Sequence, residues 1–336
     1  MVYFNGKIIS GEGAAVPIED RGFRYGDGLF ETMRAYQGKV FRLGRHVERL
    51  VESASVLGIE LGPILSDSPI HRSESAASPQ SAILRKIAEA VETVVAVNEI
   101  GEGVVRIILT RGAGEGFDVP EELRPNLIVT ARPFTPVSEE RVRTGARAII
   151  SDIRRNTFSP ISRVKSLNFL ESVLVRQEAR KAGVDEGLML DTEGHLVEAS
   201  VANLFFVREG ALYTPPTSGP ILPGITREVV MALASERSIP CFERAFFPEE
   251  LADTEEAFTT STLMELMPLV QINGRPVGAG APGAVTRTLI AAYRELVSAH
   301  SVAKPQPKNQ AQSKSKRISQ IPQGKTWSKK RSSENE

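Results

Sequence analysis

The sequence has little that could support a disulfide framework, a metal cluster or a membrane span. Its 336 residues include one cysteine, Cys241, and four scattered histidines without metal-ligand spacing. A single cysteine excludes an internal disulfide and is typical of a reducing compartment. No window approaches the roughly 18 apolar residues of a transmembrane helix, and no basic segment followed by a long apolar run opens the chain. These absences predict a cytoplasmic protein without a membrane segment or a metal centre.

The chain also lacks net charge, but its acidic and basic residues are unevenly distributed along the sequence. The formal charge is zero, yet residues 301–336 hold nine Lys or Arg against two acids, so this tail is basic and the rest of the chain is acidic. The tail is polar and has one aromatic residue, Trp327, so we expect it to be disordered and do not expect it to bind nucleic acid. One hypothesis of a different class remains, a non-catalytic binding protein with a basic tail.

Short β-prone runs and helical patterns are mixed without strict alternation. Asn-Gly pairs at Asn5-Gly6 and Asn273-Gly274 predict tight hairpins. Apolar spacing in "GRHVERLVESASVLGI" predicts a helix that ends near Gly58. The Ser/Pro-rich residues 62–82 predict a loop insertion, and a helix is expected over about 82–97. This mixture favours an α+β fold over a doubly wound sheet.

The segment "RPFTPVSEE" carries two prolines and few apolar residues, which is typical of a linker between domains. We therefore predict a small N-terminal domain over 1–133 that contains the insertion. A linker over 134–141, a larger domain over 142–300 and the basic tail over 301–336 would follow.

Two residues could carry covalent and proton chemistry. Lys165 lies in "SRVKSLNFL", between a short polar turn and a predicted helix, where its amine could face a cleft. A desolvated lysine becomes nucleophilic towards a carbonyl group. Glu198 lies in "LVEASVANLFF" at a strand end, where its carboxylate could meet a heterocyclic nitrogen. Each residue taken alone is more commonly a solvated charge.

Three further segments could bind an anion. "LPGITREVV" places Ile225 and Thr226 in the first turn of a helix, where unpaired N–H groups and a hydroxyl are available. A simple helix cap is the alternative for that threonine. "TTSTLMEL" clusters hydroxyls, including that of Thr262, at a strand end. Arg49 in "RHVERL" could grip a phosphate with its forked guanidinium, or could be an exposed arginine.

Taken together and in order, these segments resemble the fold-type IV pyridoxal-phosphate enzymes, which are the class IV aminotransferases. That family includes branched-chain aminotransferases, D-amino acid aminotransferases and 4-amino-4-deoxychorismate lyases. The likeness spans about residues 3–298, through "DRGFRYGDGLFETMR", "RHVERL", "VKSLNFL", "LVEASVANLFF", "LPGITRE" and "FTTSTLMELMPL". It implies a two-domain fold with a smaller N-terminal α/β domain and a larger domain built on a mixed, barrel-like sheet. It also implies a homodimer in which a partner loop helps to close the site.

The resemblance assigns pyridoxal 5'-phosphate as the cofactor and gives the residues their roles. Lys165 would hold the cofactor aldehyde as an imine and then act as the base on the substrate, while Glu198 would keep the pyridine nitrogen protonated. The phosphate ligands would be Arg49, Ile225, Thr226 and Thr262. The substrate side, between the two domains, would include Tyr25, Phe30, Arg34 and Leu263.

The resemblance constrains the identity of the substrate less than that of the cofactor. Gly116 and Asp118 stand about where D-amino acid enzymes and lyases of the family carry carboxylate-binding groups. An acid at Asp118 would repel a second substrate carboxylate, unless Arg34 or Arg111 compensates. Phe169 would fit an apolar pocket. We therefore expect an aminotransferase for branched-chain or other apolar amino acids with a 2-oxo acid such as 2-oxoglutarate. A lyase that releases pyruvate and forms 4-aminobenzoate, and a D-amino acid aminotransferase, are the alternatives.

Overall fold

Two separate β-sheets organise the chain in the computed structural model, which describes residues 1–66, 78–120 and 123–302. The first is a six-stranded antiparallel sheet with the order β2-β1-β6-β5-β3-β4. Its strands are β1 (Val2–Phe4), β2 (Lys7–Ile9), β3 (Gly28–Tyr36), β4 (Lys39–Val40), β5 (Gly103–Thr110) and β6 (Asn126–Pro133). Asn5 and Gly6 both have positive φ between β1 and β2, which confirms the predicted hairpin.

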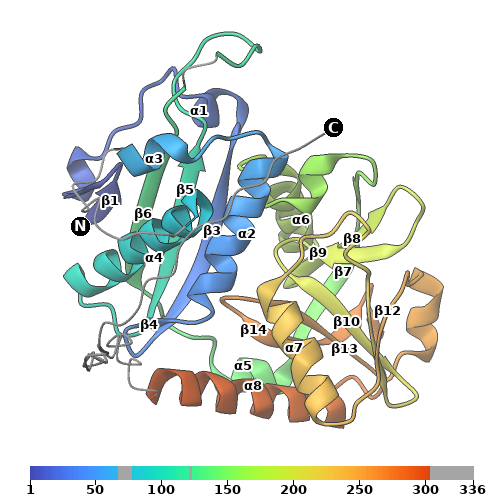
Figure 1. Ribbon diagram of the computed structural model, residues 1–336. Coiled ribbons are helices and arrows are strands. Elements are labelled where there is room, and N and C mark those ends of the chain that lie inside the picture. The colour runs from blue at the N-terminus through green and yellow to red at the C-terminus, as the bar shows by residue number, and fades with distance from the viewer. Residues whose placement is uncertain (67–77, 121–122, 303–336) are drawn as a thin grey trace, which may run out of the picture. The chain divides into compact units, whose positions relative to one another are not determined.

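Two helices cover one face of this sheet (Figure 1). Helix α2 (Leu43–Val56) buries the predicted apolar stripe, and its chain turns away at Gly58, which has φ +63°. Helix α4 (Pro79–Val97) packs beside it. Short helices α1 (Arg21–Tyr25) and α3 (Gly62–Ser66) complete this half. Because β3 and β5 are buried on almost every residue, the middle of the sheet forms the core here.

The predicted loop insertion over 62–82 is wrong at both of its ends. Residues 62–66 form α3, and α4 begins at Pro79, three residues before the predicted start. The side chain of Ser78 accepts a hydrogen bond from the Ser81 N–H, and proline at the first helical position needs no hydrogen-bond partner for its nitrogen. The middle of the segment, residues 67–77, lies outside the described residues.

The second sheet has nine strands and is mixed, as the resemblance implied. Its path runs β12-β11-β10-β13-β14-β7-β8-β9, and β9 also pairs with β10, so six of these strands close into a ring. The β14–β7 and β7–β8 pairs are parallel, and most others are antiparallel. The strands are β7 (Ala146–Arg155), β8 (Glu186–Asp191), β9 (Leu196–Ala199), β10 (Asn203–Arg208), β11 (Ala211–Thr214), β12 (Cys241–Glu243), β13 (Glu256–Ser261), β14 (Glu265–Ile272) and β15 (Arg275–Pro276).

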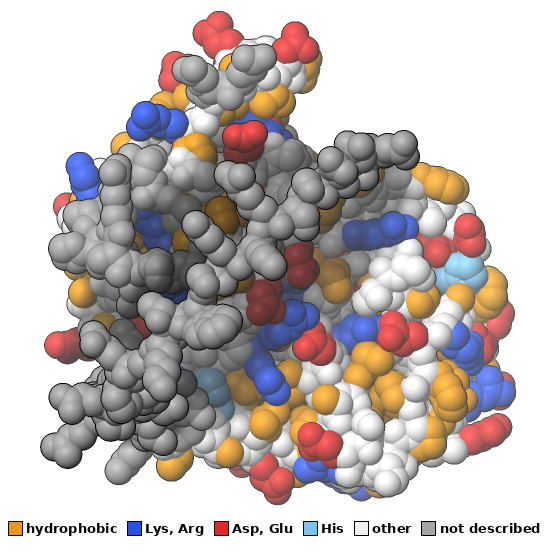
Figure 2. Space-filling model, in the orientation of Figure 1, with side chains coloured by type: hydrophobic (Ala, Val, Ile, Leu, Met, Phe, Trp, Pro, Cys, Tyr) orange, Lys and Arg blue, Asp and Glu red, His pale blue; other side chains and the backbone are white. Residues whose placement is uncertain are grey.

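Helices precede or follow strands of the second sheet and pack against it. Helix α5 (Glu139–Thr144) starts within the predicted linker, and α6 (Leu170–Lys181) packs on β7 and β8. Helices α7 (Ile225–Glu236) and α8 (Ala284–Val302) pack against each other and against β13. Tyr36 and Phe41, from the first half, share a hydrophobic cluster with Tyr293 of α8. On the face where α2 and α7 approach each other, acidic and basic side chains are interspersed (Figure 2), and Arg45 of α2 pairs with Glu228 of α7 at 3.0 Å.

Helix α8 continues to Val302, so it includes the first two residues of the predicted tail. Residues 303–336, which carry the basic charge of that tail, lie outside the described residues. Within the described part of the chain, no helix has the length and apolar content that a bilayer crossing requires.

Candidate active site

A cavity of about 810 Å³ lies between the two sheets. Its walls come from β3 and β5 of the first sheet, and from β9, β10, the start of α7 and the turn after β13 on the other side. Most of the predicted site residues line it, namely Phe30, Arg49, Lys165, Glu198, Ile225, Thr226, Thr262 and Leu263. Residues that are far apart in the sequence therefore converge on one space.

Lys165 is held at the cavity by backbone pairing across the two halves. The N–H of Phe30 donates to the Lys165 carbonyl at 2.9 Å, and the N–H of Leu167 donates to the Gly28 carbonyl at 2.9 Å. The Lys165 Nζ lies 4.5 Å from the centre of the Phe30 ring and 5.3 Å from that of Phe169. Desolvation by burial lowers the pKa of Lys165 from 10.5 to about 8. Roughly a tenth of the amine is therefore neutral and nucleophilic at pH 7.

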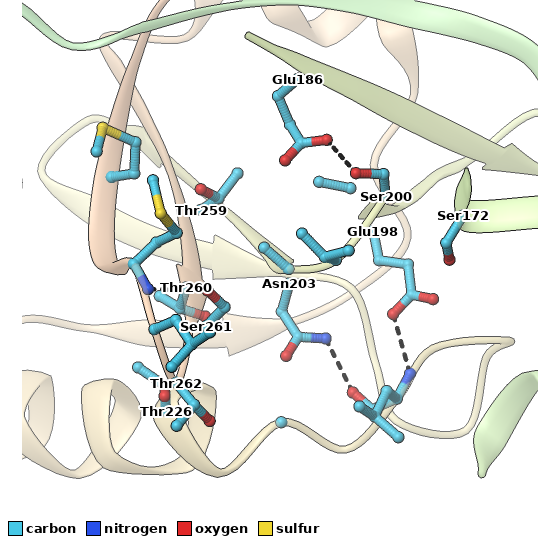
Figure 3. Close-up of a pocket in the computed structure, with 18 of the residues that line it drawn as sticks. Ser172, Glu186, Glu198, Ser200, Asn203, Thr226, Thr259, Thr260, Ser261 and Thr262 are labelled. Carbon is cyan, nitrogen blue, oxygen red and sulfur yellow. Dashed lines mark hydrogen bonds between the residues drawn. The ribbon is translucent and has the colours of Figure 1, made fainter. Parts of the chain in front are cut away.

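Glu198 presents a buried carboxylate to the same cavity. Its Oε2 accepts a hydrogen bond from the Leu222 N–H at 3.1 Å (Figure 3), and its Oε1 lies 3.1 Å from Arg155 Nε. Burial raises the pKa of Glu198, while the Arg155 charge and the Leu222 N–H oppose that rise. The group can therefore exchange a proton with a nitrogen atom placed in the cavity.

The start of α7 is open to the cavity. No side chain caps the helix at Gly224, and its first intrahelical bond joins the Glu228 N–H to the Gly224 carbonyl. The N–H groups of the first turn are thus available to an anion, with the hydroxyls of Thr226 and Thr262 beside them (Figure 3). A Cβ at Gly224 would lie 1.8 Å from Asn203 Oδ1, so only glycine fits this close approach.

Arg49 is anchored so that part of its guanidinium stays available. Its Nε and Nη2 donate to Glu31 at 2.7 and 2.8 Å, and its Nη1 donates to the Pro223 carbonyl at 2.8 Å. His46 Nδ1 lies 2.8 Å from the same Glu31 carboxylate. Burial alone would raise the pKa of Glu31, but Arg49 and His46 outweigh it and lower that pKa to about 2. Since a guanidinium has five N–H donors, two remain for a phosphate at the cavity.

Glu31 and His46 were missed by the sequence analysis, although both stand inside the quoted "FETMR" and "RHVERL" segments. Glu31 lies three residues before Arg34, and His46 lies three residues before Arg49. Neither position indicates that the Glu31 and His46 side chains are in contact. Only the packing of α2 on β3 brings them together.

Two predicted substrate arginines do not reach the cavity. Arg34 Nη1 donates to Glu265 Oε1 at 2.7 Å, and its guanidinium stacks on Tyr36. Arg111 donates to Asp27 at 2.7 Å and to two carbonyls of the turn after α2. Acidic side chains bind both guanidinium groups. Neither arginine is therefore placed to bind a second substrate carboxylate, the role in which either was expected to compensate for Asp118.

Tyr25 also lies outside the residues that line the cavity. Its ring packs on Phe117, with 5.5 Å between centroids, and Phe117 is 87% exposed. Phe117 and Asp118 belong to the connection between β5 and β6, which projects from the molecule in Figure 1. Arg21 donates to the carbonyls of Gly116 and Asp118, which fixes this projection to α1.

Arg106 is one of the arginines at the cavity that were not predicted from the sequence. It lies on β5, lines the cavity, and places its guanidinium carbon 5.0 Å from the Phe30 ring centre. In "VVRIILT" it occupies a polar position among apolar neighbours, which is typical of a solvent-facing strand residue. Only the pairing of β5 with β3 shows that this face of the sheet borders the cavity.

Known proteins are similar to this chain in both sequence and fold. The family model of class IV amino-transferases matches residues 28–272. A putative branched-chain-amino-acid aminotransferase of Methanocaldococcus jannaschii is 35% identical over 297 residues, which are 88% of this chain and 96% of that protein. D-alanine aminotransferase of Bacillus licheniformis is 32% identical over 297 residues, with 88% and 96% covered. The crystal structure of the Escherichia coli branched-chain amino acid aminotransferase has a TM-score of 0.78 and 30% identity, covering 88% of this chain and 93% of that one.

Proposed function

Because the chain belongs to the class IV aminotransferase family, whose members depend on pyridoxal phosphate, we propose that it transfers an amino group from a branched-chain or other apolar amino acid to a 2-oxo acid such as 2-oxoglutarate. The observation that carries this proposal is the Lys165 amine, with its lowered pKa, in one cavity with Glu198 and the open start of α7.

The residues of the cavity fit pyridoxal phosphate. The open first turn of α7, Thr226, Thr262 and the two remaining donors of Arg49 match a phosphate. The buried hydroxyl of Thr260 has no hydrogen-bond partner in the described structure, which is consistent with a polar group bound nearby. When bound, the cofactor supplies an aldehyde and an electron-accepting ring.

Each side chain then has a distinct task. Lys165 would hold the cofactor through its aldehyde, and its amine, once released, would take and return the proton of the reacting carbon. Glu198 would accept a hydrogen bond from the ring nitrogen. Arg49 and the first turn of α7 would hold the phosphate.

The cavity wall supports an apolar amino donor and a dicarboxylate acceptor. Phe30, Phe134 and Phe169 supply apolar surface next to Lys165. Arg106 faces the same space and would bind the second carboxylate of 2-oxoglutarate. Asp118 of the same chain does not line this cavity, because it lies on the projecting connection.

A homodimer in the cytoplasm is part of the proposal. Phe23 and Phe117 are 75% and 87% exposed on the first half, and Phe158 is 85% exposed on the second. Leu170 on α6 is 68% exposed. Large apolar side chains exposed in this way favour a protein partner, and a second copy would bring its projecting β5–β6 connection, with Tyr25, to a cavity. Light scattering across the size-exclusion peak of the purified protein would give its molar mass and so test whether it is a dimer.

The cofactor assignment is tested with borohydride. The purified protein mixed with pyridoxal phosphate should be yellow, and borohydride should fix a pyridoxyl label on Lys165, found by peptide mass spectrometry. Lys165→Ala should give no label and no turnover. A preparation that stays colourless with added cofactor would overturn the assignment.

The substrate assignment is tested with a parallel panel. L-leucine, D-alanine and 4-amino-4-deoxychorismate are offered, the first two with 2-oxoglutarate. Glutamate formed from L-leucine supports the proposal. Glutamate from D-alanine alone would make the protein a D-amino acid aminotransferase, and pyruvate from 4-amino-4-deoxychorismate alone would make it the lyase. A chain without residues 303–336 should keep its turnover. Loss of turnover on this deletion would show that the basic tail is needed for function, as the alternative of a binding protein that acts through its tail requires.

A further inference from the structure

Arg155 links the cavity carboxylate Glu198 to a second acid outside the cavity. It is the last residue of β7 and is 8% exposed. Its Nε lies 3.1 Å from Glu198 Oε1, and its Nη1 donates to Glu171 Oε2 at 3.3 Å. Its Nη2 donates to the Ser162 carbonyl at 3.1 Å, which fixes the plane of the guanidinium. One cation is therefore shared by two carboxylates.

The contact with Glu198 is electrostatic and leaves the carboxylate open. Arg155 Nε is within ion-pair distance of Glu198 Oε1, but this buried N–H does not point at the oxygen and has no hydrogen-bond partner in the described structure. Oε2 accepts from the Leu222 N–H. Oε1 therefore keeps its lone pairs for a donor in the cavity while Arg155 stabilises its negative charge.

Glu171 has the opposite influence. It lies in the first turn of α6, and its side chain is 46% exposed, so its carboxylate is in contact with water. It competes with Glu198 for the Arg155 guanidinium, and its own charge repels that of Glu198. The pKa of Glu198, raised first by burial, is lowered by the Arg155 charge and by that of Lys165, and raised by the Glu171 charge.

We propose that Arg155 and Glu171 are a pair of positioning residues with opposite effects on Glu198, Arg155 keeping its carboxylate ionised and Glu171 limiting that effect. This inference rests on the proposed function, in which Glu198 meets the ring nitrogen of the cofactor. With Glu198 ionised, the shared proton stays on the ring nitrogen, and the ring accepts electrons most strongly. Without Arg155, the proton passes to the buried Glu198.

The apoprotein allows a test that does not need the cofactor. Side-chain carboxyl carbons of glutamate are labelled with ¹³C, and the Glu198 resonance is assigned by its loss in Glu198→Gln. Arg155→Gln should raise the pH midpoint of the Glu198 titration by at least about one pH unit, because a buried carboxylate loses an adjacent cation. Glu171→Gln should lower the midpoint, and Arg155→Lys should stay closer to wild type than Arg155→Gln.

A control variant removes the same kind of exposed acid elsewhere. Glu140 pairs with Arg143 on α5 and its side chain is 65% exposed. Glu140→Gln should leave the Glu198 midpoint unchanged. If Arg155→Gln does not fold, the shift of the Glu198 midpoint in Glu171→Gln still tests the inference, because Glu171 is at the surface and its replacement should not prevent folding. A Glu198 midpoint that moves in the same direction in both variants, or that Glu171→Gln leaves in place, would overturn the inference.

The holoenzyme gives a second readout. With ¹⁵N-pyridine-labelled cofactor, the wild-type ring nitrogen should appear protonated at pH 7, and Arg155→Gln should move its resonance towards the unprotonated position. The cofactor Kd should change less than about threefold, since the phosphate cradle is untouched, while kcat falls. A wild-type protein that takes up no cofactor would overturn the proposed function, and the apoprotein titration would still judge the Arg155–Glu171 pair.

Discussion

Replacing Lys165 with methionine should stabilise the apoprotein near neutral pH, although it removes the amine that we propose as the catalytic group. Burial lowers the pKa of Lys165 from 10.5 to about 8. At about 1.36 kcal/mol for each pH unit, the buried ammonium costs about 3 kcal/mol of folding free energy. Methionine fills a similar volume without a charge, so the expected gain is about 3 kcal/mol.

The pH dependence identifies the cause. The folded-state pKa of Lys165 is below its unfolded value, so the cost is fully present below pH 8 and disappears as the pH rises to about 10.4. The difference in unfolding free energy between Lys165→Met and wild type should therefore shrink from about 3 kcal/mol at pH 7 to near zero above about pH 10.5. Urea unfolding of the apoproteins can be followed by circular dichroism, because the only tryptophan, Trp327, lies outside the described residues.

The control is an exposed lysine on a helix near the cavity. Lys181 is the last residue of α6, and Lys181→Met should show no comparable change of stability between pH 7 and 10.5. If Lys165→Met is less stable than wild type at pH 7, or if its advantage is constant across this range, the amine is not held in the desolvated state on which its nucleophilicity depends.

Three other substitutions test separate parts of the cavity. Gly224→Ala places a Cβ 1.8 Å from Asn203 Oδ1, so it should displace the start of α7 and weaken cofactor binding roughly tenfold in a spectrophotometric titration. Arg106→Met should raise KM for 2-oxoglutarate roughly tenfold and change KM for the apolar amino donor much less. Glu31→Gln should weaken cofactor binding by releasing Arg49. In wild type, cofactor affinity should not fall between pH 7 and 5 through this site, because the pKa of Glu31 is about 2.

The residues that the sequence predicted from local context do line one cavity. Lys165 before a helix, Glu198 at a strand end and Thr226 in a first helical turn are each defined by neighbours in the chain, and the cavity contains all three. The Asn-Gly hairpins were also local signals, since Asn5 and Asn273 both adopt the positive φ that such turns require.

The fate of the arginines could not be predicted in this way. Arg34 is held by Glu265, which lies 231 residues later, and Arg111 is held by Asp27 across the first sheet. Arg106 has a sequence context like that of any exposed strand residue, and only the pairing of β5 with β3 turns it towards the cavity. Whether an arginine binds substrate or an acidic side chain of the protein depends on these distant contacts.

The charges around Lys165 explain why burial dominates its ionisation. After burial, which acts most strongly, Glu31 raises the pKa of Lys165, Arg49 lowers it, Glu198 raises it and Arg106 lowers it. Two acids and two arginines act in opposite directions, and desolvation, the largest single cause, sets the direction of the shift. Glu31 thereby has two effects, because the same carboxylate that fixes Arg49, the proposed phosphate ligand, also raises the pKa of Lys165, which Arg49 lowers. An isolated phosphate-binding arginine would lower the pKa of Lys165 further, and it would lack a fixed orientation.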